Sequence, residues 1–399
     1  MQTNIILRRL SLLLSAAALL TLGGCWDQEE VNDLAIVTSL GLDRRENGSI
    51  ELTVEIVAPE QGRGAGAMPG GEGGNAAKSS GQMVIRTAEG LTAGDASTRL
   101  QTLLPRSLYW GQLETLIIGE SLARQGIREQ LDFLIRDNEV RLRVMPFVYQ
   151  GKPRDFLTSA YRLVQSKADF LSGEANRVFK HPMTLNDLVQ KFGNESDATA
   201  LPYIQIRQQG EEAVPFMEGY AVFKHDRMMG VMEKELFVGT KWLMDALNRD
   251  IVTVNMPGAS ASGVSLRVLS SKSKLSPRRT DNQWRMDIQI DTELAVIQNT
   301  TRHKTSDPNY VHQVEEAAAR QIRTFAERSI RQAQRSGADI FGFGEAIYRH
   351  SPREWSAMQK RWKDTFPSLE VDVFVQANIR RIGMNNVPVG LPRNGEESG

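Results

Sequence analysis

The chain has 399 residues, of which 41% are hydrophobic and 24% are charged. That length is enough for two or three domains, each with its own hydrophobic core. The 48 basic and 48 acidic side chains give a formal net charge of zero. The sequence therefore lacks the global positive field with which a protein attracts nucleic acid, and we expect no nucleic-acid partner.

The first 25 residues have the layout of a bacterial secretory signal. Two arginines precede an apolar run at 10–22, and the string LGGC then ends at Cys25, the only cysteine of the sequence. A basic start, an apolar centre and small residues before the cut are typical of such signals. The LGGC string resembles a lipobox, in which the cysteine sulfur carries diacylglycerol and the cysteine becomes the first mature residue. We predict a signal peptide at 1–24 and lipidation of Cys25.

Two other interpretations of Cys25 fit less well. A lone cysteine is often a small buried hydrophobe, but here acidic and polar residues follow it, which is not a core pattern. An uncleaved membrane anchor needs about 20 apolar residues, and the run at 10–22 has 13. Two acyl chains, with or without a further N-acyl chain, hold a protein stably on a bilayer. We therefore expect a lipoprotein whose only non-peptide group is this lipid, with no other cofactor.

The first predicted domain, 25–198, mixes strands with helices. The patterns predict strands at 34–42, 50–56, 113–119 and 140–149, and helices at 94–104, 122–136 and 185–192. Thr184 and Asp187 are spaced as a helix capping box. The segment 61–81 is rich in glycine, alanine and serine and predicts a mobile loop. It lacks the Gly-Lys-Ser or Gly-Lys-Thr of a phosphate-binding loop.

The second predicted domain covers 199–279. The patterns predict strands at 219–223, 228–232, 251–256 and 264–269, a turn at 224–227 and a helix at 241–247. The polar stretch 270–279 contains Lys272, Lys274, Arg278 and Arg279. We interpret it as a solvated strand end or loop, since its charges are spread over polar sequence. Contact with lipid headgroups or with an acidic partner is the alternative.

The third predicted domain covers 280–385. An alternating strand at 286–296 precedes Asp307-Pro308, which opens an amphipathic helix that runs to about residue 335. Ser351-Pro352 predicts the start of another helix through a capping box, and 369–379 predicts a final strand. The remainder, 386–399, predicts a flexible tail. Because strands and helices mix without a regular repeat, the sequence predicts an α+β fold of three domains in a row.

No catalytic constellation stands out. The sequence has no His-Glu-x-x-His pair and no Gly-x-Ser-x-Gly elbow, and the mature chain has no thiol. We therefore expect no metal site and no enzymatic activity. Phe341 and Phe343 lie in a glycine-containing connection, where we interpret them as buried plugs; contact with a partner is the alternative. Trp26 and Asp27 follow the lipid site and form either a spacer or a contact with membrane or partner.

Three stretches resemble the C subunits of nutrient germinant receptors of the GerA type in spore-forming bacteria, the Ger(x)C lipoprotein family. They are GCWDQEEVNDLAIV at 24–37 with Gly41 and Asp43, GYAVFKHDRMMG at 219–230, and IRQAQRSGADIFGFGEAIYR at 330–349 followed by Trp355, Trp362 and Phe366-Pro367. The stretches occur in order and span nearly the whole mature chain. The chief departure is the glycine-rich segment 61–81.

The resemblance implies a three-domain α+β subunit without known enzymatic activity. It implies a lipid anchor on the outer face of the spore inner membrane and two integral-membrane partners, the A-type and B-type receptor subunits. Such a subunit would take part in the response to nutrients during spore germination. The alternative is an extracytoplasmic solute-binding lipoprotein that captures the nutrient itself, while a cell-wall hydrolase would need an acidic pair in a cleft.

Overall fold

The computed structural model describes residues 31–58, 82–159, 166–193, 196–210, 212–256, 262–281, 283–301 and 303–382. The predicted lipid site with Cys25, Trp26 and Asp27, the glycine-rich segment 61–81 and the tail 386–399 lie outside these ranges. Their predictions therefore stay predictions. Within the described ranges, no helix is long and apolar enough to cross a membrane.

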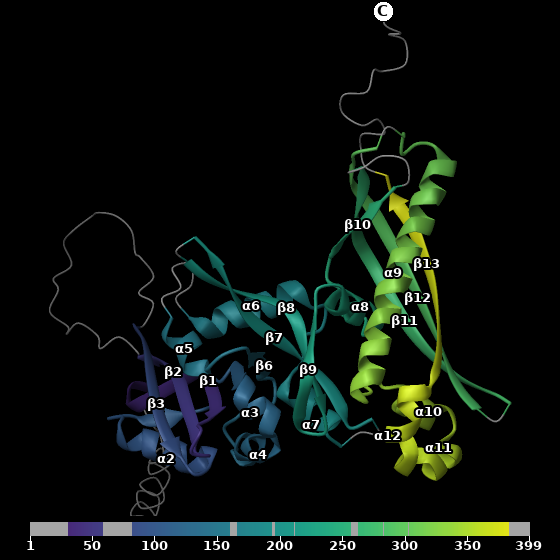
Figure 1. Cartoon of the computed structure of the whole chain (residues 1–399). Coiled ribbons are helices and arrows are strands. Elements are labelled where there is room, and N and C mark those ends of the chain that lie inside the picture. The colour runs from purple at the N-terminus through teal and green to yellow at the C-terminus, as the bar shows by residue number, and fades with distance from the viewer. Residues whose placement is uncertain are drawn as a thin grey trace, which may run out of the picture.

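The first sheet has nine strands in the order β3-β2-β1-β5-β6-β7-β8-β9, with β4 beside β1 (Figure 1). The strands span Leu34–Arg44 (β1), Ile50–Ala58 (β2), Gln82–Gly90 (β3), Ser107–Tyr109 (β4), Thr115–Gly119 (β5), Met145–Tyr149 (β6), Ala198–Gln209 (β7), Glu212–Lys224 (β8) and Arg227–Glu233 (β9). β1, β5, β6 and β7 run parallel, and the outer strands pair antiparallel. Helices connect β5 to β6 and β6 to β7, so two parallel crossovers lie within a mixed sheet.

Helices cover both faces of this sheet. They span Ala93–Thr102 (α2), Glu120–Gln125 (α3), Arg128–Arg136 (α4), Pro153–Thr158 (α5), Lys167–Val178 (α6) and Leu185–Lys191 (α7), after a short 3-10 turn at Val31–Asp33. Side chains of a strand alternate between its two faces. Accordingly, Leu116 and Ile118 of β5 join the core under α2, α3, α4 and α7, whereas Ile117 joins the core under α5 and α6. The predicted capping box of α7 is confirmed, because Thr184 and Asp187 exchange both hydrogen bonds.

The second sheet has four strands in the order β10-β11-β12-β13 and packs against one long helix. The strands span Ile251–Asn255 (β10), Gly263–Thr280 (β11), Gln283–Asn299 (β12) and Glu370–Arg381 (β13). The helix α9 covers Pro308–Ser336, begins at the Asp307 cap and ends at Gly337, which has a φ of 64°. Its buried residues are Tyr310, Val314, Ala318, Ile322, Ala326, Ser329, Ile330 and Ala333. The prediction of a long helix from Asp307-Pro308 to about residue 335 is confirmed.

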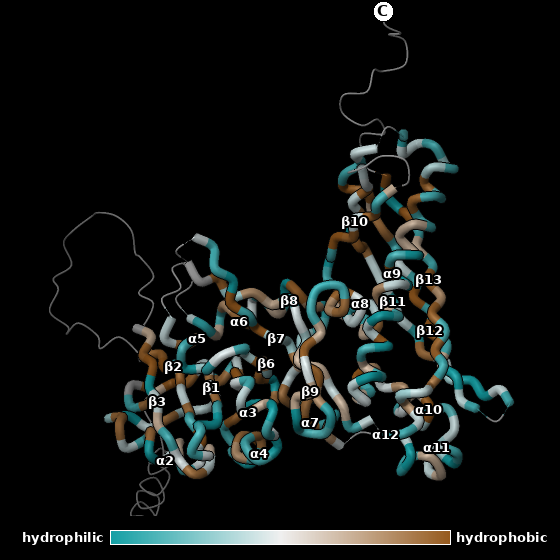
Figure 2. The backbone as a smooth tube through the Cα atoms, viewed as in Figure 1, coloured by the Kyte–Doolittle hydropathy of each residue, from teal (hydrophilic) through white to brown (hydrophobic). Residues whose placement is uncertain are grey.

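Shorter helices complete the second half of the chain. Helix α8 (Glu235–Leu243) connects the two sheets, and α10 (Phe343–His350), α11 (Pro352–Met358) and α12 (Trp362–Thr365) lie near the end of α9, with 3-10 turns at Gln359–Arg361 and Phe366–Ser368. Apolar side chains from both sheets join one cluster that includes residues of α8 and α9. In Figure 2, which colours the backbone by hydropathy, hydrophobic and hydrophilic positions alternate along α9. The two halves of the molecule therefore share a core.

The α+β class predicted from the sequence is confirmed, and the division into three domains stays a prediction. The described strands form two sheets. The predicted boundary at 198/199 falls within β7, which pairs with β6 on one side and with β8 on the other. The predicted boundary at 279/280 falls at the end of β11, where the hairpin to β12 begins.

Candidate functional site

The connection between α9 and α10 is organised by one buried carboxylate. Asp339 accepts hydrogen bonds from the backbone N–H groups of Phe343 (2.9 Å) and Gly344 (2.8 Å). It also accepts a bond from the indole N–H of Trp362 at 3.2 Å. Burial is the largest influence on this group and raises the pKa of Asp339, while the three hydrogen bonds act in the opposite direction. A single side chain thus holds the turn, the first turn of α10 and helix α12 together.

The two phenylalanines of this connection differ in exposure. Phe343 is fully buried, with its ring 5.9 Å from that of Phe366. Its side chain is therefore not accessible to a partner in this structure, because the core of the second half takes it up. Phe341 is half-buried and lies against Phe343, with ring centroids 5.8 Å apart. The interpretation as buried plugs fits Phe343 fully and Phe341 in part.

The glycines of the same connection are required by close approach and by backbone conformation. Gly342 has a φ of 77°, in the left-handed region that glycine enters most readily. A Cβ atom at Gly344 would lie 2.7 Å from the ring of Trp355 and 3.0 Å from the indole nitrogen of Trp362. The Gly-Phe-Gly string is therefore a structural turn against two tryptophans.

A depression lies at the carboxyl ends of β1, β5 and β6. In sheets with parallel strands, ligands commonly bind outside these ends. The depression has a volume of about 790 Å³ and is open to solvent; the residues that line it are Asp43, Arg44, Arg45, Glu46, Asn47, Gly48, Glu89, Ser121, Gln125, Gln150, Gly151 and Lys152. Position and size make it the first candidate for binding a small solute.

Some of the charges at this depression are engaged by neighbouring groups. Arg45 forms ion pairs with the buried Glu51 and, at 2.7 Å, with Glu89. Asp43 is buried and accepts hydrogen bonds from the N–H groups of Arg44 (2.9 Å) and Leu122 (3.4 Å). Burial is the largest influence on Asp43 and raises its pKa, against the lowering effect of these two bonds. The arrangement favours a structural carboxyl over a group poised for acid–base chemistry.

The raised pKa of Asp43 gives a testable pH dependence. The charged form of Asp43 is disfavoured in the folded chain above its folded-state pKa, and this penalty disappears as the pH falls below the unfolded-state pKa. Asparagine would keep the oxygen that accepts both backbone bonds and would carry no charge. We therefore expect the free energy of unfolding of Asp43→Asn, relative to that of the native chain, to be higher at about pH 7 than at about pH 4. Urea unfolding at both pH values measures this, and an equal difference at both would contradict it.

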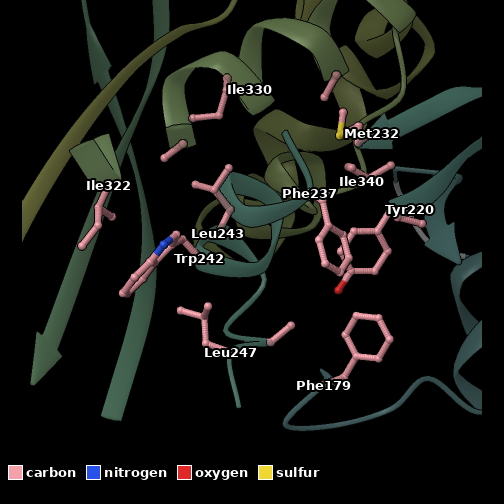
Figure 3. Packing of buried hydrophobic residues seen from close by; sticks show 14 of the residues in the cluster. Phe179, Tyr220, Met232, Phe237, Trp242, Leu243, Leu247, Ile322, Ile330 and Ile340 are labelled. Carbon is pink, nitrogen blue, oxygen red and sulfur yellow. The ribbon is translucent and has the colours of Figure 1, made fainter. Parts of the chain in front are cut away.

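The region between the two sheets contains a buried ion pair beside an aromatic cluster. The rings of Phe179, Tyr220 and Phe237 lie 5.1 to 6.1 Å apart (Figure 3). Lys241, whose side chain is 3% exposed, bonds to Asp250 at 2.5 Å. Burial lowers the pKa of Lys241, against the opposing effect of Asp250. These residues come from both halves of the molecule, so this region packs the two halves against each other.

Helices α8 and α9 meet in this region without a side chain between them at one point. A Cβ atom at Gly239 would lie 2.2 Å from the carbonyl oxygen of Phe325 and 2.4 Å from the hydroxyl of Ser329. Ser329 donates a hydrogen bond to the carbonyl of Leu236 at 2.9 Å and so joins the two helices. Sequence periodicity predicts this helix at 241–247, whereas the structure has it at Glu235–Leu243. The helix is buried on most sides, so its sequence shows no polar stripe from which its bounds could be predicted.

We expect Gly239→Ala to lower the free energy of unfolding by about 1–3 kcal/mol, because the added methyl forces the two backbones apart. The matched control is Gly173→Ala in α6, where a Cβ atom meets nothing within 4 Å. That substitution should stabilise the chain by about 0.5–1 kcal/mol, since glycine weakens a helix interior. Thermal and urea unfolding of both variants tests this, and equal effects of the same sign would contradict the close-contact explanation.

Metal ligation finds no support within the described ranges, where no group of three histidine, cysteine, aspartate or glutamate residues is arranged to hold an ion. The five predicted contact and lipidation residues are not brought together by the described structure. Cys25, Trp26 and Asp27 lie outside it, Phe341 lies in the connection after α9, and Phe343 is the first residue of α10. Sequence reasoning missed the depression at the carboxyl ends, because its residues come from several separate segments.

Both halves of the chain match models of spore germination proteins. Residues 27–206 match the spore germination protein N-terminal domain, and residues 218–383 match the C-terminal domain described as spore germination B3/GerAC-like. Spore germination protein KC of Bacillus subtilis is 26% identical over 397 residues, covering 93% of this chain and 95% of that protein. The putative spore germination protein YfkR of Bacillus subtilis is also 26% identical and covers 91% and 94%, respectively.

A solved structure has the same fold. The crystal structure of the GerBC protein superposes with a TM-score of 0.52 at 14% sequence identity, covering 88% of this chain and 100% of that chain. The chain belongs to the Ger(x)C family of spore germination proteins.

Proposed function

We propose that this chain is a lipid-anchored, non-catalytic subunit of a spore nutrient germinant receptor. The observation that carries the proposal is the ordered match of both halves to spore germination domains, at 27–206 and 218–383. Curated relatives of nearly the same length are named spore germination proteins. A role in spore germination follows from this relationship, and the anchor and the partners are the finer parts of the proposal.

The anchor is supported by the signal layout that ends at Cys25. The first described residue, Val31, follows only six positions later. An extended chain reaches at most about 3.6 Å per residue, so this linker spans at most about 22 Å. A lipidated Cys25 would therefore keep the folded body close to the bilayer surface. We place it on the outer face of the spore inner membrane.

Partner docking is the second finer part of the proposal. A body held within about 22 Å of the bilayer is well placed to contact integral-membrane subunits, which we take to be the A-type and B-type subunits of the receptor. In this proposal, the shared core of the two sheets lets contact with one partner displace the surface that faces the other. In this view the chain contributes contacts and not chemistry to the nutrient response.

Affinity purification of the tagged chain from detergent-solubilised spore membranes tests partner docking, with mass spectrometry of the captured proteins. We expect a multi-span transporter-like protein and a second membrane subunit. Recovery of the chain alone under gentle extraction would contradict docking. The same sample shows by the mass of its N-terminal peptide whether Cys25 carries the lipid, so the two parts of the proposal are tested separately.

The depression at the carboxyl ends of β1, β5 and β6 favours a second candidate, an extracytoplasmic solute-binding lipoprotein. Its volume of about 790 Å³ would admit an amino acid, a sugar or a nucleoside. Calorimetry of the purified chain against these three classes of nutrient distinguishes the candidates. Saturable micromolar heats that Gln150→Ala weakens would favour solute capture, and their absence would leave the subunit role as the better explanation.

A further inference from the structure

A second depression lies where the two halves of the molecule meet, between the β8–β9 turn, the end of α9 and helix α12 (Figure 1). Its volume is about 580 Å³. The residues that line it are Lys224, Arg331, Gln334, Arg335, Ser336, Gly337, Lys363 and Pro367. Four of these eight residues are cationic and none is acidic. The four cations come from β8, α9 and α12.

Three of the four cations have no ion-pair partner within the described part of the chain. No described carboxylate oxygen lies within 4.0 Å of the charged nitrogens of Lys224, Arg335 or Lys363. Arg331, in contrast, pairs with Glu327 at 3.5 Å. The depression at the carboxyl ends of β1, β5 and β6 is different, because there Arg45 is matched by Glu51 and Glu89. The positive charge at the end of α9 is therefore not neutralised by neighbouring side chains.

The helix end accounts for only part of this charge. The last carbonyls of an α-helix carry about half a negative charge and attract basic side chains. Lys224 lies beside this helix end and can balance its negative charge. Its Nζ would lie 2.9 Å from a Cβ atom added at Gly337, the residue directly after α9. Arg335 and Lys363 remain, so at least two positive charges in excess face the same depression. A cluster of unpaired cations in a concave site favours a ligand with more than one negative charge.

We propose that this depression binds a multiply charged phosphate-type anion, either the headgroup of an acidic lipid or a soluble phosphate compound. Arginine forks and lysine ammonium groups are the side chains that recognise phosphate oxygens. Such a ligand would contact the β8–β9 turn of the first sheet and the α9–α12 region of the second half at once. Binding would therefore tie the two halves of the molecule together at their surface. The ligand is opposite in charge to the site, and its binding does not depend on the proposed lipid at Cys25.

The test uses the full chain in non-ionic detergent, titrated with inorganic pyrophosphate by calorimetry at low salt. We expect saturable binding that weakens as salt is added. The double variant Arg335→Gln/Lys363→Gln should weaken it about a hundredfold, because each lost charge-assisted bond corresponds to roughly a tenfold change. The matched control Lys272→Gln/Lys274→Gln removes two exposed charges from β11 and should leave the affinity unchanged.

Two further titrations identify the source of the anion. In nanodiscs that contain cardiolipin, whose headgroup carries two phosphates, a pocket filled by lipid headgroups would bind pyrophosphate more weakly than in nanodiscs of phosphatidylcholine. Equal affinity in both would assign the site to a soluble phosphate compound. Absence of saturable binding, or an equal loss in the Arg335/Lys363 variant and in the control, would overturn the proposal. Both variants should unfold at the same urea concentration as the native chain, so that a loss of binding reports on the site and not on the fold.

Discussion

Replacing Asp339 with alanine should lower the free energy of unfolding by about 3–5 kcal/mol, the largest loss that we expect from one polar substitution in this chain. The carboxylate accepts from two backbone N–H groups and from the indole of Trp362. All three donors are buried, so they would lose their partner without gaining water. Each buried donor left without a partner costs about 1–3 kcal/mol, and the three effects are coupled because they hold one turn.

The matched control is Asp364→Ala, which removes an exposed carboxylate in α12, two residues from Trp362. We expect a change within about 0.5 kcal/mol for this control. Asp339→Asn should fall between the two, since asparagine keeps one acceptor oxygen and turns an amide donor toward donors. Urea unfolding followed by tryptophan fluorescence measures all three. Equal stabilities of the Asp339 and Asp364 alanine variants would contradict the role assigned to Asp339.

The part of the fold with strict hydrophobic periodicity could be predicted from the sequence. Helix α9 shows an apolar stripe between an Asp-Pro start and a glycine end, and the structure has the same start and end. The strand predicted at 369–379 corresponds to β13 at Glu370–Arg381. In both elements one face is buried and the other meets solvent, which is the condition under which a period becomes visible in sequence.

Elements without this condition were predicted with errors. The prediction of a loop or strand end at 270–279 is wrong in its loop form, because β11 continues to Thr280. Its serines and lysines carry no apolar period, and the pairing with β12 alone determines the strand. The helix predicted at 122–136 is two helices, since Gly126 has a φ of 125° and interrupts it.

Two further errors have local causes. The strand predicted at 140–149 begins only at Met145, because residues before it form a turn closed by the N–H of Val144 and the carbonyl of Arg141. The capping box predicted at Ser351 is wrong, since its side chain makes no capping bond, although proline does follow at the first helical position.

The candidate sites were less accessible to sequence reasoning than the fold. The string that contains Asp339 was noticed for its glycines, and the carboxylate that organises it was not. The basic depression combines Lys224 with Arg335 and Lys363, each of which lies more than one hundred residues from Lys224 along the chain. Sequence analysis instead singled out the basic stretch 270–279, where Arg278 and Arg279 are engaged by Asp372 and Glu354. Only the folded arrangement separates cations with partners from cations without them.

Replacing Cys25 with alanine should release the chain from the membrane and impair germination with at least one nutrient. Alanine has no sulfur to carry the diacylglyceryl group, and each buried acyl methylene contributes about 0.8 kcal/mol to membrane binding. The apolar run at 10–22 does not replace the lipid, since its 13 residues fall short of a span. We expect the variant in the soluble fraction of spore extracts, measured by immunoblotting after a high-salt and carbonate wash.

The matched control is Gly24→Ala, which keeps a small residue before the predicted cut and leaves Cys25 in place. It should remain in the washed membrane fraction and support germination like the native chain. If Cys25→Ala also resisted the wash, the acyl chains would not be what holds the protein on the membrane. If the soluble variant supported full germination, holding the body at the bilayer would not be needed for the nutrient response. The wash removes chains that are held by surface charge alone. Resistance to the wash therefore tests the lipid anchor, and germination with the soluble variant tests whether the anchor is needed for function.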